Sequence, residues 1–383
     1  MAGFNASVLE AIGNTPIVEL NRYGAEVSPL LLAKLEFTNP GGSMKDRAAL
    51  GMIEWAEREH SLAPGAEIII STSGNLGIGM AMTCAVKGYR LICLVDPKLN
   101  PSTERSLELL GAELVKVDER DLTGGYHLTR LKRLETLQAE RPSAIYLDQY
   151  DSPAAIEAHR TSTGREILEQ MDGRLDAMIM VAGTGGSSMG VARWLREHSP
   201  DTRIWLVDEV GSLALPCSTE PEPRFLNGMG TSLEPANYAG ESFHDFVDEV
   251  VYIEAGEAIT AAIEIARSEG ILMGGSGGAA CHVMREQVAP HFDRDARLLA
   301  LIPDHGSRYT QTQFDVEWLE AMGILVPALT PSQHSLPIPA HCFSVSRMSS
   351  TLVRPMLTGW ALCWSRCLCC TSSRRLPRRR AAF

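Results

Sequence analysis

The sequence predicts an α/β protein with two domains, each built on a mostly parallel sheet that helices cover. Three observations predict this class. Short apolar runs alternate with amphipathic stretches from about residue 30 to residue 303. The runs are almost continuously apolar, which is typical of parallel strands buried on both faces. The length of 383 residues is more than one hydrophobic core usually spans, so it favours two domains.

Strands are expected wherever a β-branched or aliphatic run is short. They fall at residues 30–37, 67–72, 90–95, 113–117, 144–147, 177–183, 203–208 and 297–303. Helices are expected where apolar residues recur three and four positions apart. They fall at residues 46–59, 75–88, 102–111, 121–139, 160–171, 187–197, 255–269 and 277–289. The first series of strands and helices ends near residues 146–151, where we place the domain boundary.

Charge and hydropathy exclude some kinds of partner. The whole chain has a net charge of −12, and residues 334–383 hold eight Arg but no Lys, Asp or Glu, so the rest is strongly acidic. An acidic body repels phosphate backbones, which argues against nucleic acid. No run approaches the roughly 20 apolar residues of a membrane span, and the first residues do not resemble a secretory signal. We therefore expect a cytoplasmic protein without a membrane partner.

The last fifty residues have a different composition from the rest. They hold five of the nine cysteines, and Cys367, Cys369 and Cys370 form a C-x-C-C cluster. This spacing is not typical of a zinc site, because no second C-x-x-C pair supplies the other ligands. We therefore expect no metal site. The end of the chain has neither helical nor strand periodicity. Residues 331–383 are therefore predicted to be a disordered or non-native tail outside the fold.

A lysine stands at the start of a predicted helix, in the segment Asn39-Pro40-Gly41-Gly42-Ser43-Met44-Lys45-Asp46-Arg47. A helix N-terminus carries partial positive charge, so an ammonium there is electrostatically misplaced. The pKa of Lys45 is then lowered, or its amine is consumed as an imine. Either outcome favours a nucleophilic lysine. The alternative is an ordinary solvated lysine.

Two other loops could bind anions. Thr72, Ser73 and Asn75 lie between a strand and a helix, where they could hold a carboxylate, although a simple helix cap would need only one of them. A second loop consists of Gly183, Thr184, Gly185, Gly186 and Ser187, and it also opens a helix. It has neither the lysine of a P-loop nor the third glycine of the dinucleotide fingerprint. It therefore suits a single terminal phosphate.

A fourth loop, residues 274–279, places Ser276 among glycines at another helix start. Its hydroxyl could lie close to a flat ligand, or the loop could be a flexible turn. Taken together, a reactive lysine, a carboxylate site, a phosphate site and this hydroxyl are what a pyridoxal-phosphate enzyme needs.

The order of these motifs resembles the cysteine synthase and cystathionine β-synthase family, which has the tryptophan synthase β-like fold (pyridoxal-phosphate fold type II). The resemblance covers about residues 8–325. It rests on the segments Ile12-Gly13-Asn14-Thr15-Pro16, Pro40–Arg47, Thr72–Asn75, Gly183–Ser187 and Pro303–Tyr309.

The resemblance implies a role for each candidate residue. Lys45 would carry pyridoxal phosphate as a Schiff base and move the Cα proton. Asn75 would bind the ring hydroxyl of the cofactor, Ser276 would face the pyridine nitrogen, and Gly183, Thr184, Gly185, Gly186 and Ser187 would bind the phosphate. The substrate would be held by Thr72, Ser73, Asn75, Leu76, Gln149 and Gly228.

The resemblance also implies an organisation of domains. Residues 1–37 and 146–330 would form a large cofactor-binding domain. Residues 38–145 would form a smaller mobile domain, which closes over the substrate carboxylate and shields the intermediate from water. Family members are usually homodimers.

The implied reaction is a β-replacement on O-phosphoserine or O-acetylserine through an aminoacrylate. Leu76 stands where cysteine synthases typically have Thr, and residues 207–212 and 227–232 look like the siderophore and antibiotic branch that makes 2,3-diaminopropionate precursors. We therefore expect an amino-acid amine such as glutamate as second substrate. The alternatives are a cysteine synthase that uses sulfide or a thiol, a serine/threonine dehydratase-like eliminase, and, from another class, an inactive binding protein of the same fold.

Overall fold

The computed structural model describes residues 4–72, 74–97, 99–120, 126–215, 222–238 and 243–329. The chain divides into two units, Met1–His334 and Ser335–Phe383. The second unit, and with it the predicted tail 331–383, lies outside the described residues. All of the described residues belong to the first unit.

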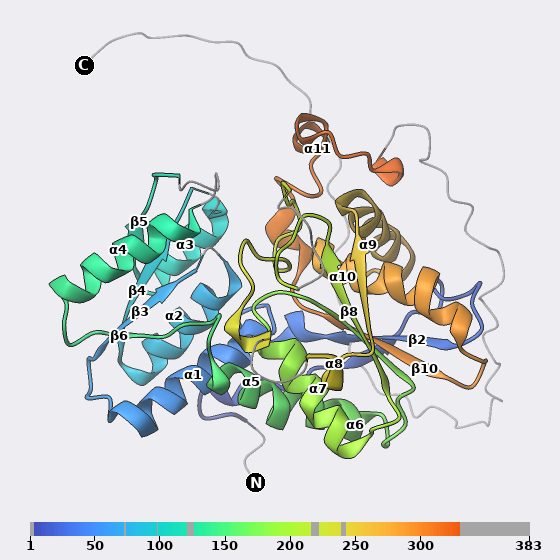
Figure 1. Ribbon diagram of the computed structural model, residues 1–383, viewed down its shortest axis with the longest axis horizontal. Coiled ribbons are helices and arrows are strands. Elements are labelled where there is room, and N and C mark those ends of the chain that lie inside the picture. Colours follow the sequence, from blue (N-terminus) through green and yellow to red (C-terminus); the bar gives the residue numbers. More distant parts are fainter. Residues whose placement is uncertain are drawn as a thin grey trace, which may run out of the picture. The chain divides into compact units, whose positions relative to one another are not determined.

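The larger sheet of this unit has six strands in the order β1-β2-β10-β7-β8-β9. Figure 1 labels β2, β8 and β10 of this sheet. Their bounds are β1 Ile17–Glu19, β2 Leu30–Leu35, β7 Ala177–Val181, β8 Arg203–Glu209, β9 Glu249–Ile253 and β10 Arg297–Ile302. β1 runs antiparallel to β2, and the other pairings are parallel.

The smaller sheet has four strands in the order β5-β4-β3-β6, and all its pairings are parallel. Their bounds are β3 Glu67–Ser71, β4 Arg90–Val95, β5 Glu113–Lys116 and β6 Ile145–Tyr146. The helices are α1 Lys45–His60, α2 Asn75–Lys87, α3 Pro101–Leu109, α4 His127–Glu140, α5 Pro153–His159, α6 Arg165–Gln170, α7 Gly186–His198, α8 Phe243–Phe246, α9 Ala255–Glu269, α10 Gly275–Val283 and α11 Val316–Met322. No helix within the described residues is long and apolar enough to cross a membrane.

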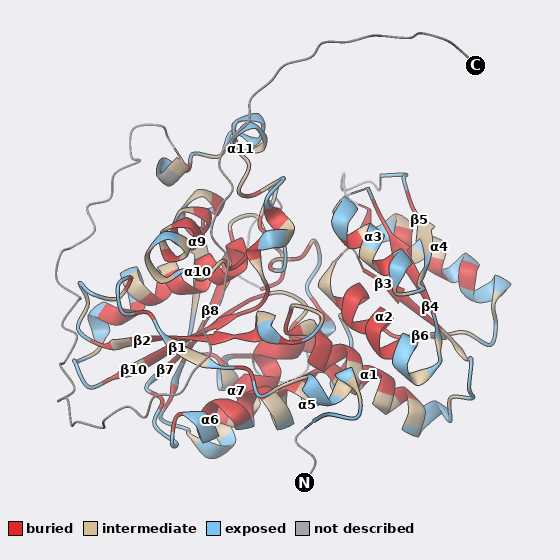
Figure 2. Cartoon of the chain, turned by 180° about the vertical axis from the view of Figure 1, so that it is seen from behind, coloured by how far each residue is buried: buried red, intermediate tan, exposed pale blue. Residues whose placement is uncertain are grey.

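The central strands of both sheets are buried on both faces, and Figure 2 draws buried residues in red. The edge strands β1, β5 and β9 are only partly buried. Successive side chains of a strand point to opposite faces. In β7, Ile179 packs in the cluster that contains α9 and α10, whereas Met178 and Met180 pack in the cluster that contains α7. In β3, Ile68 packs with α1 and α2, and Ile69 packs with α4. The predicted α/β class with parallel sheets between helices is confirmed.

Several element bounds differ from the prediction. The strand expected at 30–37 ends at Leu35, because a 3-10 turn at Glu36–Thr38 bends the chain. The helix expected at 160–171 begins earlier, at Pro153, where Ser152 Oγ accepts a hydrogen bond from the amide of Ala155 at 3.1 Å. A π-helical turn at Arg160–Gly164 then joins α5 to α6.

Other elements were not expected at all. β1, β9 and α11 were not predicted, because each is short and its apolar pattern is weak. The helix expected at 121–139 is described from His127 onward. The division into a large domain and a small mobile one stays a prediction.

Candidate active site

A cavity of about 190 Å³ lies where strands of both sheets end and helices begin, the usual ligand position in open α/β sheets. Eight of the predicted residues line it: Lys45, Thr72, Asn75, Leu76, Gln149, Gly183, Thr184 and Gly228. The wall also includes side chains to which the sequence assigned no role, among them Arg130, Tyr150 and Tyr309. Ser73 lies outside the described residues.

Lys45 is the first residue of α1, one residue before the predicted start of this helix. The helix has no side-chain cap, and the amide of Lys45 donates to Ser43 Oγ at 3.3 Å. Burial lowers the pKa of the Lys45 amine to about 8, against the opposing effect of the Asp304 carboxylate. An amine with this pKa is far more readily available as a nucleophile at neutral pH than that of a solvated lysine.

The loop after β3 is fixed by contacts from other segments. Gln149 donates through Nε2 to the carbonyl of Ser71 at 3.1 Å, and Thr72 Oγ1 accepts from the amide of Gly74 at 3.3 Å. Asn75, the first residue of α2, donates through Nδ2 to Asp304 Oδ2 at 2.7 Å and accepts from Arg308 at Oδ1. The structure thus brings the predicted carboxylate-binding residues that it describes to one wall of the cavity.

The predicted phosphate loop leads into α7, whose first two residues are Gly186 and Ser187, and it is held by Asn237 and Tyr238. Asn237 donates through Nδ2 to the carbonyl of Thr184 at 2.6 Å, and the amide of Gly183 donates to Tyr238 Oη at 3.3 Å. Gly185 has a φ of +86°, and a Cβ there would lie 2.7 Å from Asn237 Cβ, so only glycine fits. The first amides of α7 have no intrahelical acceptor and can bind an anion. Gly185, Gly186 and Ser187 are not among the residues that line the cavity.

Ser276 is the second residue of α10 and is fully buried. Its Oγ makes no hydrogen bond with any described residue. A Cβ built on Gly228, which lines the cavity, would lie 3.5 Å from that oxygen. A buried hydroxyl without a partner costs free energy unless a ligand completes it. This orphaned hydroxyl, the α7 N-terminus and the amine of Lys45 fit the pyridine nitrogen, phosphate and aldehyde of pyridoxal phosphate.

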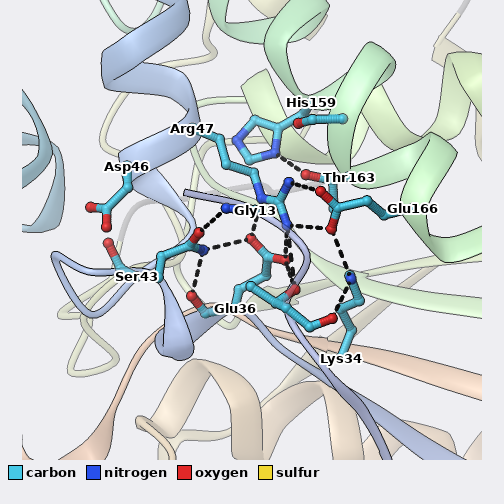
Figure 3. A network of polar contacts seen from close by, with 12 residues as sticks. Gly13, Lys34, Glu36, Ser43, Asp46, Arg47, His159, Thr163 and Glu166 are labelled. Carbon is cyan, nitrogen blue, oxygen red and sulfur yellow. Dashed lines mark hydrogen bonds and ion pairs between the residues drawn. The ribbon is translucent and has the colours of Figure 1, made fainter. Parts of the chain in front are cut away.

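Four buried charged groups lie beneath the start of α1 (Figure 3). Arg47 binds Glu36 through Nε and Nη2, both at 2.8 Å, and Glu166 through Nη1 at 2.7 Å and Nη2 at 2.8 Å. Lys34 Nζ lies 3.1 Å from Glu166 Oε2 and donates to the carbonyl of Thr15 at 2.8 Å. We call Lys34, Glu36, Arg47 and Glu166 the ion cluster.

The ion cluster fixes the loop that carries Lys45 at both ends. At one end, Asn39 donates through Nδ2 to the carbonyl of Glu36 at 2.7 Å and accepts from the amide of Gly13 at 2.8 Å. At the other end is Arg47, two residues after Lys45. Two cations and two anions leave the cluster without net charge, which lets it remain buried.

Other residues of this site were not predicted from the sequence. Asp304 follows β10 after one residue, Pro303, so the rule that ligands bind at the carboxyl ends of strands could have found it. Arg130 lies in the first part of α4, and nothing in its local pattern separates it from a surface arginine. Asn237 lies in a 3-10 turn that is far along the chain from the phosphate loop it contacts, and no sequence motif indicates its role.

Comparison with known proteins agrees with this geometry. Residues 8–304 match the family model described as "Pyridoxal-phosphate dependent enzyme". The N-(2-amino-2-carboxyethyl)-L-glutamate synthases of Ralstonia nicotianae and Cupriavidus metallidurans are each 37% identical to this chain. These matches cover 86% and 82% of this chain, and 96% and 91% of the relatives.

Solved structures show the same relationship. The crystal structure of O-ureido-L-serine synthase superposes with a TM-score of 0.74 and is 31% identical, over 82% of this chain and 96% of that one. The match of the family model over most of the chain, together with these relatives, leads to one conclusion: this chain belongs to the family of pyridoxal-phosphate dependent enzymes.

Proposed function

We propose that this enzyme replaces the phosphate of O-phosphoserine with the amine of an amino acid, with glutamate as the first compound to test. The observation that carries the choice of donor is a buried arginine, Arg130, on the wall of the cavity that contains Lys45. The reaction class follows from the family, and the two synthases at 37% identity are named for a glutamate product.

Pyridoxal phosphate, when bound, withdraws electrons from the Cα of an amino acid, so that the Cα proton and a β-substituent can leave. In our assignment Lys45 holds the cofactor and then takes the Cα proton on Nζ. Gly183, Thr184, Gly185, Gly186 and Ser187 bind the phosphate, Asn75 the ring hydroxyl, and Ser276 the ring nitrogen. A neutral hydroxyl at that nitrogen leaves it unprotonated, which favours elimination over transamination.

The substrate carboxylate would lie at the N-terminus of α2. Thr72, Asn75 and Gln149 line the cavity at this helix start, and Ser73 is proposed to bind with them. Leu76 is buried and adds an apolar wall. Closure of residues 38–145 over this end would exclude water from the reacting atoms. We further propose that the enzyme is a homodimer and acts in the cytoplasm.

Arg130 supports a phosphorylated donor. Its Nη1 lies 3.2 Å from Asp96 Oδ2, while Nε makes no hydrogen bond with any described residue. A guanidinium has five N–H donors, so the pair with Asp96 leaves some of them for a ligand. Phosphate is doubly charged and binds arginine through two oxygens, whereas an acetyl ester is neutral. This arginine therefore favours O-phosphoserine over O-acetylserine.

Arg130→Gln is expected to lower kcat/KM for O-phosphoserine by about 10-fold to 150-fold, because a charge-assisted hydrogen bond contributes about 1.5–3 kcal/mol. The value for O-acetylserine should change by less than about threefold, since its leaving group carries no charge for Arg130 to meet. Stopped-flow absorbance of the cofactor after mixing with each donor measures both. Arg133→Gln is the matched control, because Arg133 lies on the same helix and binds only Glu140 among the described residues. Equal losses with both donors would refute the role.

The second substrate is tested by product analysis. The enzyme is incubated with O-phosphoserine and either glutamate or sulfide, and the products are identified by mass spectrometry. We expect the glutamate adduct. Formation of cysteine alone would indicate a cysteine synthase, pyruvate alone an eliminase, and no product with either glutamate or sulfide an inactive binding protein.

A further inference from the structure

Residues 303–305 lie between the two loops that carry Lys45 and Ser276. On one side, the amide of Met44 donates to the carbonyl of Pro303 at 2.9 Å, and Ser43 forms a β-bridge with Asp304. On the other side, the amide of Gly274 donates to the carbonyl of Asp304 at 3.2 Å. The backbone therefore fixes Asp304 relative to both loops.

The Asp304 side chain is fully buried. Its Oδ2 accepts hydrogen bonds from Asn75 Nδ2 at 2.7 Å and from the hydroxyl of Tyr309. Its Oδ1 makes no hydrogen bond with any described residue and lies against Gly274, where a Cβ would collide with it. Burial raises the pKa of Asp304, while the hydrogen bonds from Tyr309 and Asn75 act in the opposite direction. Two donors on one oxygen favour the ionised carboxylate.

This carboxylate fixes the amide of Asn75. Arg308 donates to Asn75 Oδ1, and Asp304 accepts from Asn75 Nδ2. A rotated amide would direct its oxygen at the carboxylate and its N–H groups at the guanidinium, so only one orientation is stable. Asp304 and Arg308 thus act on Asn75 from opposite sides.

Asp304 also forms a β-bridge with Ser43, two residues before Lys45, and its carboxylate opposes the effect of burial on the pKa of the Lys45 amine. The other ionisable groups around Lys45 come from several elements. Asp46 is the next residue of α1, Arg308 and Tyr309 line the same cavity, and His159 at the end of α5 is kept neutral because burial lowers its pKa.

We propose that Asp304 is a positioning residue of this active site, which holds the Asn75 amide in one orientation and keeps a fixed negative charge beside Lys45. The proposal rests on the roles of Lys45 and Asn75 in the proposed function. The charge would stabilise a protonated nitrogen on Lys45, both when Lys45 holds the cofactor and when its amine has taken the Cα proton. It also explains a glycine at position 274, since a side chain there would displace the carboxylate.

The test is a pH titration of the visible absorption band of the cofactor-loaded, full-length protein, from about pH 6 to about pH 11. Asp304→Asn keeps the shape of the side chain and removes its charge. We expect the pH at which half of the band is lost to fall by about one unit or more, because the protonated linkage loses its counter-charge. Asp46→Asn is the matched control. Asp46 is also buried and adjoins Lys45, but its carboxylate binds the amide of Gly41 instead, so its titration should match the wild type.

Two results would overturn the proposal. One is that Asp304→Asn loses its band at the same pH as the wild type, and the other is that Asp46→Asn shows a shift as large as that of Asp304→Asn. If Asp304→Asn does not fold, Tyr309→Phe decides, because it removes one donor from the carboxylate. It should shift the titration in the same direction by a smaller amount, and an unchanged titration would overturn the proposal. Loss of the proposed function is distinguishable, since a band that survives in Lys45→Ala would refute the role of Lys45 whatever Asp304 does.

Discussion

Lys45→Ala is expected to lower kcat for β-replacement by at least about 1000-fold and to abolish the visible band of the protein. Two contributions are lost together. A positioned general base accounts for about 100-fold to 10,000-fold in rate, and the covalent attachment of the cofactor disappears as well. The measurement is product formation under saturating cofactor, with the donor that the wild type uses best.

The control for this variant is Lys87→Ala. Lys87 lies at the end of α2, where it pairs with Glu57, outside the cavity. Its removal should leave kcat within about twofold, since a surface ion pair contributes about 1 kcal/mol or less to stability. Activity of Lys45→Ala within tenfold of the wild type would show that another residue carries the cofactor.

Arg47→Met is expected to destabilise the protein by about 3–5 kcal/mol, because it removes one partner from a buried cluster of charges. Glu36 and Glu166 would then lie near each other with only Lys34 to balance them. Urea unfolding followed by circular dichroism measures the change in the free energy of unfolding.

Arg160→Met is the matched control for Arg47→Met. Arg160 also bridges two glutamates, Glu157 and Glu197, but these pairs are on the surface. Its loss should cost less than about 1 kcal/mol. Equal destabilisation of the two variants would contradict the view that the ion cluster anchors the loop of Lys45.

The ion cluster also predicts how stability depends on pH. Burial opposes the charge of Glu166, but the hydrogen bonds and charge of Arg47 outweigh it and lower the pKa of Glu166 from 4.5 to about 2. A carboxylate whose pKa is depressed in the folded state contributes stability that is present above the unfolded value and lost as the pH falls through the folded one. The wild type should therefore lose stability between about pH 4.5 and pH 2, and Glu166→Gln should lose less over that interval.

The sequence predicts the parts of this molecule that depend on local pattern. Buried parallel strands such as β4 and β7 are continuous apolar runs, and the loops after them hold Gly and hydroxyl residues. These local features are enough to indicate much of the cavity wall. The short edge strands β1 and β9 were not predicted, because their formation depends on the neighbouring strands more than on their own residues.

Contacts between distant segments could not be predicted in this way. Arg47 and Glu166 are far apart in the chain, and the packing of α1 against α5, which leads into the helix of Glu166, brings them together. Arg130 has the pattern of an ordinary helical arginine, and its function depends on the cavity beside it. The role of Asp304 could not be predicted either, because it depends on the hydrogen bonds that Asp304 accepts from Asn75 and Tyr309.

The central claim is that Lys45 is the residue to which pyridoxal phosphate is attached. The most direct test is to reduce the cofactor-loaded protein with borohydride, digest it and map the peptide that carries the added mass. We predict the reduced cofactor on the peptide that contains Lys45, in the wild type but not in Lys45→Ala. Modification of a different lysine, or no modified peptide in a yellow protein, would contradict this assignment.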